Sequence, residues 1–134
     1  MTLLISDSPL TVDETVTQIE TILTERHIKI FSIFNHSGEA QQLKLPLADC
    51  QVVVFGDPRV GTNLMLLDPR IGIALPLKLL VWKDTTKGTQ VAYQDPATLV
   101  YQFAVSDHMS ILDKMRQLLE DIVIEATRKE IVTC

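Results

Sequence analysis

Residues 55–65, FGDPRVGTNLM, have the spacing of a loop that could hold a phosphate group. Gly56 and Gly61 are separated by four residues, and an apolar run leads into them, as a strand does in a phosphate-binding loop. In nucleotide hydrolases a lysine follows the second glycine directly, and a serine or threonine then binds magnesium. Here Thr62 and Asn63 occupy those positions, and an aspartate inside the loop would repel a phosphate. These residues argue against a nucleoside triphosphate site.

Two interpretations of this stretch remain open. In the first, Gly56 and Gly61 give the backbone freedom to turn from a strand into a helix, with Pro58 at the first helical turn. In the second, free amides at the helix N-terminus, helped by Arg59, bind an anion or a small acidic ligand. The second interpretation predicts these ligand-binding residues: Gly56, Asp57, Pro58, Arg59, Gly61, Thr62 and Lys78.

Four titratable side chains make up a second candidate site. His36 in a turn after a strand could share a cleft with Lys78, Asp95 and Asp57, and this cleft would hold a general base and a cationic partner. The alternative is a histidine bonded to turn backbone, a lysine on an exposed strand face and an aspartate that caps a helix. We favour this alternative.

The histidines and cysteines give no sign of a metal site. His27, His36 and His108 are scattered, and no two of them have the spacing of metal ligands. Cys50 and Cys134 are far apart, which is typical of one buried thiol and one spare thiol. We therefore predict neither a metal nor a cofactor.

The composition is that of a soluble globular domain. The chain has 134 residues, of which 46% are hydrophobic and 22% charged, which argues against intrinsic disorder. Its net charge is −5, and no run of lysine and arginine would attract a phosphate backbone, so we predict no nucleic-acid partner. We find no secretory leader pattern and no apolar stretch long enough to cross a bilayer. These features predict a cytoplasmic protein without a membrane partner.

Local patterns predict both helices and strands. A capping box of Thr11 and Glu14 begins a helix whose apolar face continues to residue 23. An apolar stripe predicts a long final helix at about 107–128, with the stripe facing the core rather than a partner. The other predicted elements are strands at 28–34 and 51–55, a loop and helix at 56–68, a hairpin of 77–83 and 89–94, and a short helix at 96–103. The segment 39–47 is ambiguous, and a short helix is possible there.

These elements predict an α+β fold. We expect a two-layer sandwich with an antiparallel or mixed sheet and helices packed on one face, as a single compact domain over residues 1–134. The strand at 51–55 is predicted to be buried on both faces, and Trp82 and Tyr93 to lie close together on adjacent strands. We recognise no internal repeat.

The loop continues into a longer pattern, FGDPRVGTNLMLLDPRIGIALPLKLLVWKD, followed by VAYQDPATL. Its motif residues are Phe55, Gly56, Pro58, Gly61, Thr62, Leu64, Met65, Pro69, Leu75, Pro76, Leu77, Lys78, Trp82, Tyr93, Asp95 and Pro96. This pattern resembles the prokaryotic family called domain of unknown function 302 (DUF302), over residues 8 to about 103. The resemblance implies a two-layer α+β domain that associates as a homodimer, and it implies no activity. The chain departs from the family's usual residues at Asn35, Asp57, Ala74 and Lys83.

Two classes of function follow. The first is a non-catalytic dimeric module that binds a small ligand or a protein partner near the loop at 56–61, because signature residues are concentrated in turns. The alternative is an enzyme that uses acid–base chemistry by His36 and Asp95. The alternative requires both side chains to open into one concave pocket.

Overall fold

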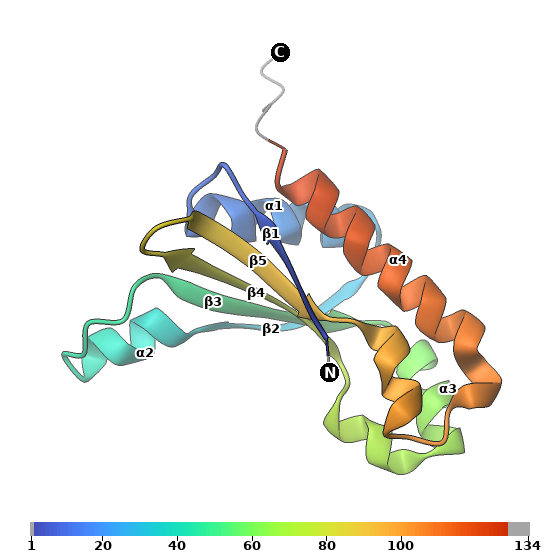
Figure 1. The fold of residues 1–134 in the computed structure, drawn as a ribbon. Helices are drawn as coiled ribbons and strands as arrows, with labels where there is room; N and C mark the ends of the chain where they lie inside the picture. Colours follow the sequence, from blue (N-terminus) through green and yellow to red (C-terminus); the bar gives the residue numbers. More distant parts are fainter. Residues whose placement is uncertain (1, 129–134) are drawn as a thin grey trace.

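The protein folds as a five-stranded sheet covered by helices, shown as a computed structural model that describes residues 2–128 (Figure 1). The strands are β1 (Leu3–Asp7), β2 (Lys29–Asn35), β3 (Cys50–Gly56), β4 (Leu77–Asp84) and β5 (Gly88–Gln94). The α-helices are α1 (Val12–Glu25), α2 (His36–Gln42), α3 (Pro58–Leu67) and α4 (Met109–Ala126). Three short 3-10 helices are η1 (Pro69–Ile73), η2 (Pro96–Tyr101) and η3 (Ser106–His108).

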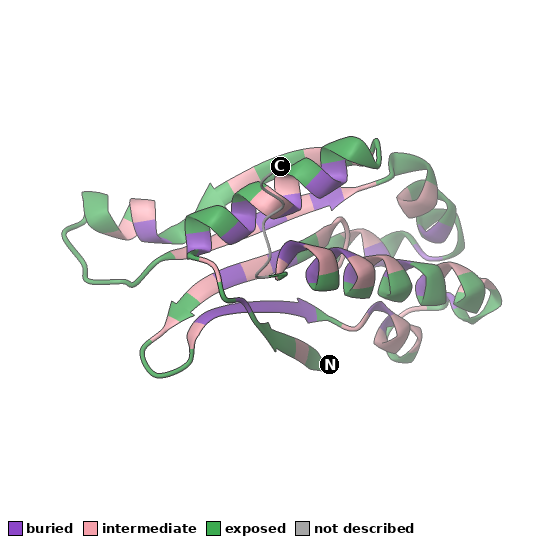
Figure 2. Cartoon of the chain, turned by 90° about the horizontal axis from the view of Figure 1, so that it is seen from above, coloured by how far each residue is buried: buried purple, intermediate pink, exposed green. Residues whose placement is uncertain are grey.

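The sheet has the order β1-β5-β4-β3-β2, and every neighbouring pair is antiparallel. The predicted α+β class is confirmed, and the sheet is antiparallel rather than mixed. Strand β1 was not predicted from the sequence. It is a five-residue edge strand, largely exposed (Figure 2), so its pattern carries little of the burial signal on which strand prediction depends.

Helices α1 and α4 lie side by side on one face of the sheet (Figure 1). The predicted capping box is confirmed: Thr11 Oγ1 accepts from the Glu14 amide at 3.1 Å, and Glu14 Oε1 accepts from the Thr11 amide at 3.0 Å. The stripe of α4 faces the core, as predicted. The buried side chains shared by the sheet and these helices include Val16, Ile19, Leu23, Val53, Phe55, Leu79, Val81, Val91, Leu119 and Ile122.

A second apolar cluster lies beyond the end of the sheet, where α3, η1, η2 and α4 meet. It is formed by Leu64, Ile71, Leu99, Val105, Leu112 and Met115. Asp95 begins η2 as predicted, with its Oδ1 accepting from the Ala97 amide at 3.0 Å. This cluster fixes α3 and the start of β4 relative to α4.

Three local predictions are corrected by the structure. Strand β3 buries Val53 and Phe55, but its alternate residues Val52 and Val54 stay partly exposed, so one face of the strand is open. Tyr93 belongs to the core, whereas Trp82 points the other way because it follows the core residue Val81 on its strand. His36, which was predicted to lie in a turn, begins helix α2, and this helix continues to Gln42 in the segment where a short helix was left possible.

Gly88, the first residue of β5, has the left-handed backbone that the predicted hairpin requires, with φ +76°. An added Cβ would meet nothing within 4 Å, so only backbone strain opposes a side chain there. We expect Gly88→Ala to lower the free energy of unfolding by about 1 kcal/mol, and Gly88→Asn to cost less. Urea denaturation measures both, and an alanine variant as stable as the parent would contradict the prediction.

Candidate functional site

A cleft of about 410 Å³ opens between the end of the sheet and helices α3 and α4. Its wall is predominantly apolar and combines residues from both chain halves: Ile28, Phe31, Val60, Met65, Leu75, Pro76, Leu77, Met115 and Leu118. Concave sites with apolar walls are the usual binding sites for small organic molecules. The cleft is therefore the candidate functional site.

The structure places most of the predicted ligand-binding residues at this cleft. Those that line it are Gly56, Asp57, Pro58, Gly61 and Thr62. Arg59 is not part of the wall, and its side chain is 90% exposed. Lys78 lies on the other face of the sheet, where its Nζ donates to the Pro76 carbonyl at 3.2 Å.

Asp57 already satisfies the groups that would bind an anion at the start of α3. Its Oδ1 accepts from the Arg59 amide at 2.9 Å, and its Oδ2 lies 3.3 Å from the Arg59 guanidinium. The backbone hydrogen bond from Arg59, and then the bond from its side chain, hold the pKa of Asp57 below its usual value. An anion would have to displace Asp57 from both contacts.

The two glycines of the motif do not serve the purpose that the sequence suggested. Gly88 is the glycine in the left-handed region among residues 2–128, so neither Gly56 nor Gly61 has the backbone that only glycine adopts readily. Gly61 is not in a loop but inside α3. The prediction that these glycines supply backbone freedom is therefore wrong.

What each of these glycines provides is space in the cleft wall. A Cβ at Gly61 would lie 3.8 Å from Leu75 Cδ1 and 3.8 Å from Met65 Cε, which are ordinary contacts between cleft residues. A Cβ at Gly56 would lie 3.7 Å from Pro76 Cβ. Alanine would therefore fit at position 61, and a helix is more stable with alanine than with glycine by about 1 kcal/mol. The fold does not require glycine here.

The structure does not bring His36 and Asp95 together. His36 begins α2 and contacts Phe34 edge to face, with ring centroids 4.8 Å apart. It follows Asn35, which the sheet register places at the level of Val91. Asp95 lies four residues beyond Val91, and β5 is three strands away from β2, so the two positions are roughly 20 Å apart. Asp95 is engaged as a helix cap and in a 3.5 Å ion pair with Arg116. The acid–base alternative thus lacks the shared pocket that it requires.

Burial also leaves Cys50 without the features of a reactive thiol. Its side chain is partly buried at the start of β3, and this burial raises the pKa of the thiol. Cys134 lies outside the described residues. Cys50 is thus only partly buried, whereas the sequence predicted one buried thiol.

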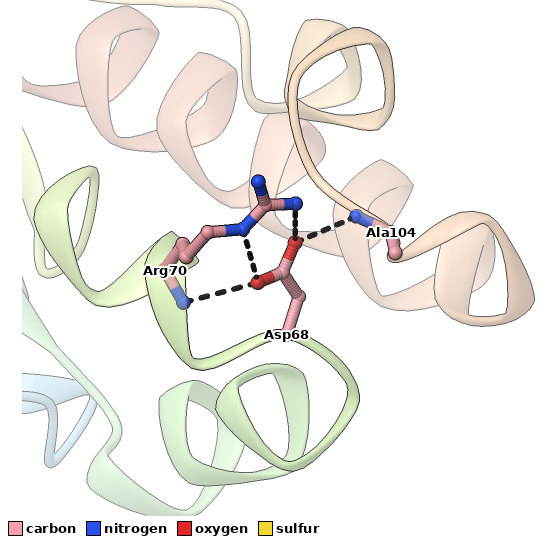
Figure 3. Close-up of polar contacts among 3 residues, drawn as sticks. All are labelled: Asp68, Arg70 and Ala104. Carbon is pink, nitrogen blue, oxygen red and sulfur yellow. Dashed lines mark hydrogen bonds and ion pairs between the residues drawn. The ribbon is translucent and has the colours of Figure 1, made fainter.

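A polar cluster that the sequence interpretation missed lies directly after α3. The stretch DPRVG at 57–61 recurs as DPRIG at 68–72, so the chain does contain a short internal repeat. In the second copy Asp68 accepts three hydrogen bonds from Arg70: at 3.1 Å from the amide, at 2.9 Å from Nε and at 2.8 Å from Nη2 (Figure 3). The Ala104 amide adds a fourth at 3.0 Å. The repeated motif in the sequence was the signal that could have revealed this cluster.

The two copies of the motif differ in burial. The side chain of Asp57 is 40% exposed, whereas that of Asp68 is 5% exposed. Hydrogen bonds from the Arg70 side chain, and then from the Ala104 amide, hold the pKa of Asp68 well below its usual range. Asp68 thereby ties the end of α3 to the segment that leads into α4.

Comparisons with known proteins identify relatives over most of the chain. The family model described as "Domain of unknown function DUF302" matches residues 5–126. The crystal structure of an uncharacterized conserved protein DUF302 from Bacillus stearothermophilus superposes with a TM-score of 0.83 at 18% identity, covering 96% of this chain and 99% of that one. The likeness at this identity establishes the fold.

Curated relatives are longer proteins. The chain is 28% identical over 94 residues to the fluoride-specific ion channel FluC 1 of Brucella suis biovar 1. These 94 residues cover 70% of this chain and 37% of that protein. The corresponding FluC 1 of Brucella abortus biovar 1 matches at 28% identity over 35% of its length. The chain thus spans little more than a third of these relatives. Within residues 2–128, no helix is both long and apolar enough to cross a membrane.

Proposed function

We propose that this chain, which belongs to the DUF302 family, is a non-catalytic dimeric module that binds a small apolar ligand in the cleft beside Gly56 and Gly61. The observation that carries the proposal is the pair of glycines. Each occupies a position where an added Cβ would make only ordinary contacts with residues of the cleft wall. Glycine inside a helix is unfavourable, and here it keeps the cleft open.

The wall of the cleft supports an apolar ligand rather than an acidic one. Asp57 caps α3 and pairs with Arg59, so an anion would have to compete with this carboxylate for the Arg59 amide and guanidinium. The side chains that face the cavity are aliphatic, aromatic or thioether groups such as Phe31, Met65 and Met115. Methionine adapts its shape to apolar partners, which suits a site for flexible hydrocarbon groups.

The relatives support the role of a module. A segment similar to this chain makes up little more than a third of proteins named fluoride-specific ion channels. A domain that occurs within longer proteins of a different stated function is typical of a binding or regulatory part. The transport of fluoride is a property of those proteins, and the proposal for this chain concerns only the cleft.

A titration with a neutral apolar dye tests the proposal. Nile red should bind saturably with one site per chain and a dissociation constant on the order of micromolar, as expected for a small hydrocarbon surface buried in a preformed cleft. Decan-1-ol should displace the dye, whereas inorganic phosphate at the same concentration should not. Displacement by phosphate, or the absence of saturable dye binding, would contradict the proposal.

A further inference from the structure

The face of the sheet opposite α1 and α4 carries a continuous apolar row. The side chains that alternate with the core residues of each strand point to this face. The strand registers align one such residue from each strand at the same level, from one edge of the sheet to the other: Ile5, Ala92, Leu80, Val52 and Phe34.

The residues of this row are unusual for a sheet face that is exposed to solvent. An antiparallel sheet covered on one side alternates apolar residues toward the core with polar residues toward water. Here Ile5 is 54% exposed and Phe34 is 45% exposed, although both are large apolar residues. Leu80 and Val52 are partly exposed, whereas Ala92 is buried at 2% exposure. The exposed part of the row therefore consists of four apolar side chains, and exposed apolar patches of this kind mark interaction sites.

The rows on either side of the apolar row carry opposite charges. On one side, Lys78 lies opposite Val54 and is exposed. On the other side, Asp7 lies opposite Gln90, and its Oδ1 accepts from Gln90 Nε2 at 2.7 Å. In a second copy turned end to end, the row that contains Asp7 lies over the row that contains Lys78, and the two side chains are two strands apart because Asp7 is on β1 and Lys78 is on β4.

We infer that two copies of this chain associate through this face, with the apolar row along the two-fold axis and β4 of one copy running antiparallel across β4 of the other. This inference rests on the dimeric part of the proposed function and names the surface that forms the dimer. Leu80 sits on the axis, and Lys78 and Trp82 lie two residues to either side of it on β4. The axis therefore places Trp82 of each copy over Lys78 of the other.

The open face also has a shape that accepts this arrangement. A hollow of about 300 Å³ lies beside Lys78, bordered by Leu3, Leu80 and Gln94. The two-fold axis sets the indole of Trp82 from the other copy above this hollow, where an aromatic ring gains apolar contact and a cationic neighbour. Five strands of about seven residues give a face of roughly 24 Å by 23 Å. That footprint of about 550 Å² is about two-thirds of the roughly 800 Å² of accessible surface that each partner buries in a standard interface.

Substitution at the axis tests the surface, and the single tryptophan of the chain reports on it. In Leu80→Lys two lysines would meet on the axis, so we expect light scattering after size exclusion to give a dimer for the parent and a monomer for the variant at the same concentration. The control is Leu66→Lys on α3, which removes an apolar residue that is 77% exposed elsewhere. It should remain a dimer.

Tryptophan emission provides a second measurement on the same samples. Dissociation exposes Trp82, so its emission should shift to longer wavelength in Leu80→Lys and on dilution of the parent, but not in Leu66→Lys. A parent that is monomeric at every concentration would overturn both the dimer and its surface. A dimer that persists in Leu80→Lys, or dissociates without an emission shift, would overturn the surface alone. Dye binding in the cleft should be unchanged in Leu80→Lys, so failure of the ligand proposal is recognised separately.

Discussion

Replacing Gly61 with leucine is expected to leave the protein folded and to lower its affinity for the apolar dye by roughly tenfold or more. The first side-chain atom fits beside Leu75 and Met65 at ordinary contact distance, and the remaining atoms must occupy the cleft. A ligand of the proposed kind then loses the volume that it needs. Gly61→Ala should reduce the affinity less, because a single methyl group narrows the cleft without filling it.

The alanine substitution at Gly61 should also stabilise the protein. Gly61 lies within α3 and has no left-handed backbone, so alanine gains helix propensity without strain. We expect Gly61→Ala to raise the free energy of unfolding by about 0.5–1 kcal/mol in urea denaturation. Gly88→Ala is the matched control: it should lower stability and leave dye binding unchanged. If Gly61→Ala destabilises the protein, or if Gly61→Leu binds dye like the parent, the assignment of the cleft is wrong.

The contrast between these glycines shows what the sequence could and could not predict. The position of the cleft was predictable, because the motif from Gly56 to Thr62 follows a strand and leads into a helix. The structural role of the two glycines was not predictable, since the sequence does not distinguish a glycine that bends the backbone from one that leaves space for a ligand. Only the packing of Leu75 and Met65 beside Gly61 separates the two cases.

The predictable parts of the fold are local. The capping box of α1, the stripe of α4 and the hairpin at Gly88 each depend on residues within a few positions of one another. The open face depends instead on strand registers that align residues as distant in the sequence as Ile5 and Ala92. No spacing in the sequence expresses that alignment, so the apolar row was not foreseen.

Asparagine in place of Asp68 is expected to produce the largest loss of stability among substitutions of polar residues. The side chain is 5% exposed and accepts hydrogen bonds from Arg70 and from the Ala104 amide. In asparagine one oxygen becomes an NH2 group, which would face one of these donors and leave it unsatisfied. We expect Asp68→Asn to lower the melting temperature by about 5–10 °C.

The first copy of the repeated motif provides the matched control. Asp57 makes the same contacts with its own arginine, but its side chain is 40% exposed, and water can replace what asparagine loses. Asp57→Asn should therefore lower the melting temperature by no more than about 2 °C. Equal decreases in melting temperature for the two substitutions would show that the burial of Asp68 and its hydrogen bond from Ala104 do not contribute to stability.

The pH dependence of stability shows how much of the contribution of Asp68 to stability comes from its negative charge rather than from the shape of its side chain. The pKa of Asp68 in the folded protein lies below the value of 3.8 that applies to an unperturbed aspartate. The unfolded chain therefore takes up a proton first as the pH falls, so this carboxylate stabilises the fold fully above about pH 5 and progressively less as the pH drops below 4. The melting temperature of the parent should decline more steeply between about pH 5 and pH 3 than that of Asp68→Asn. Parallel curves for the two proteins would mean that Asp68 is not the ionised anchor between α3 and α4, and the cleft would then owe its shape to apolar packing alone.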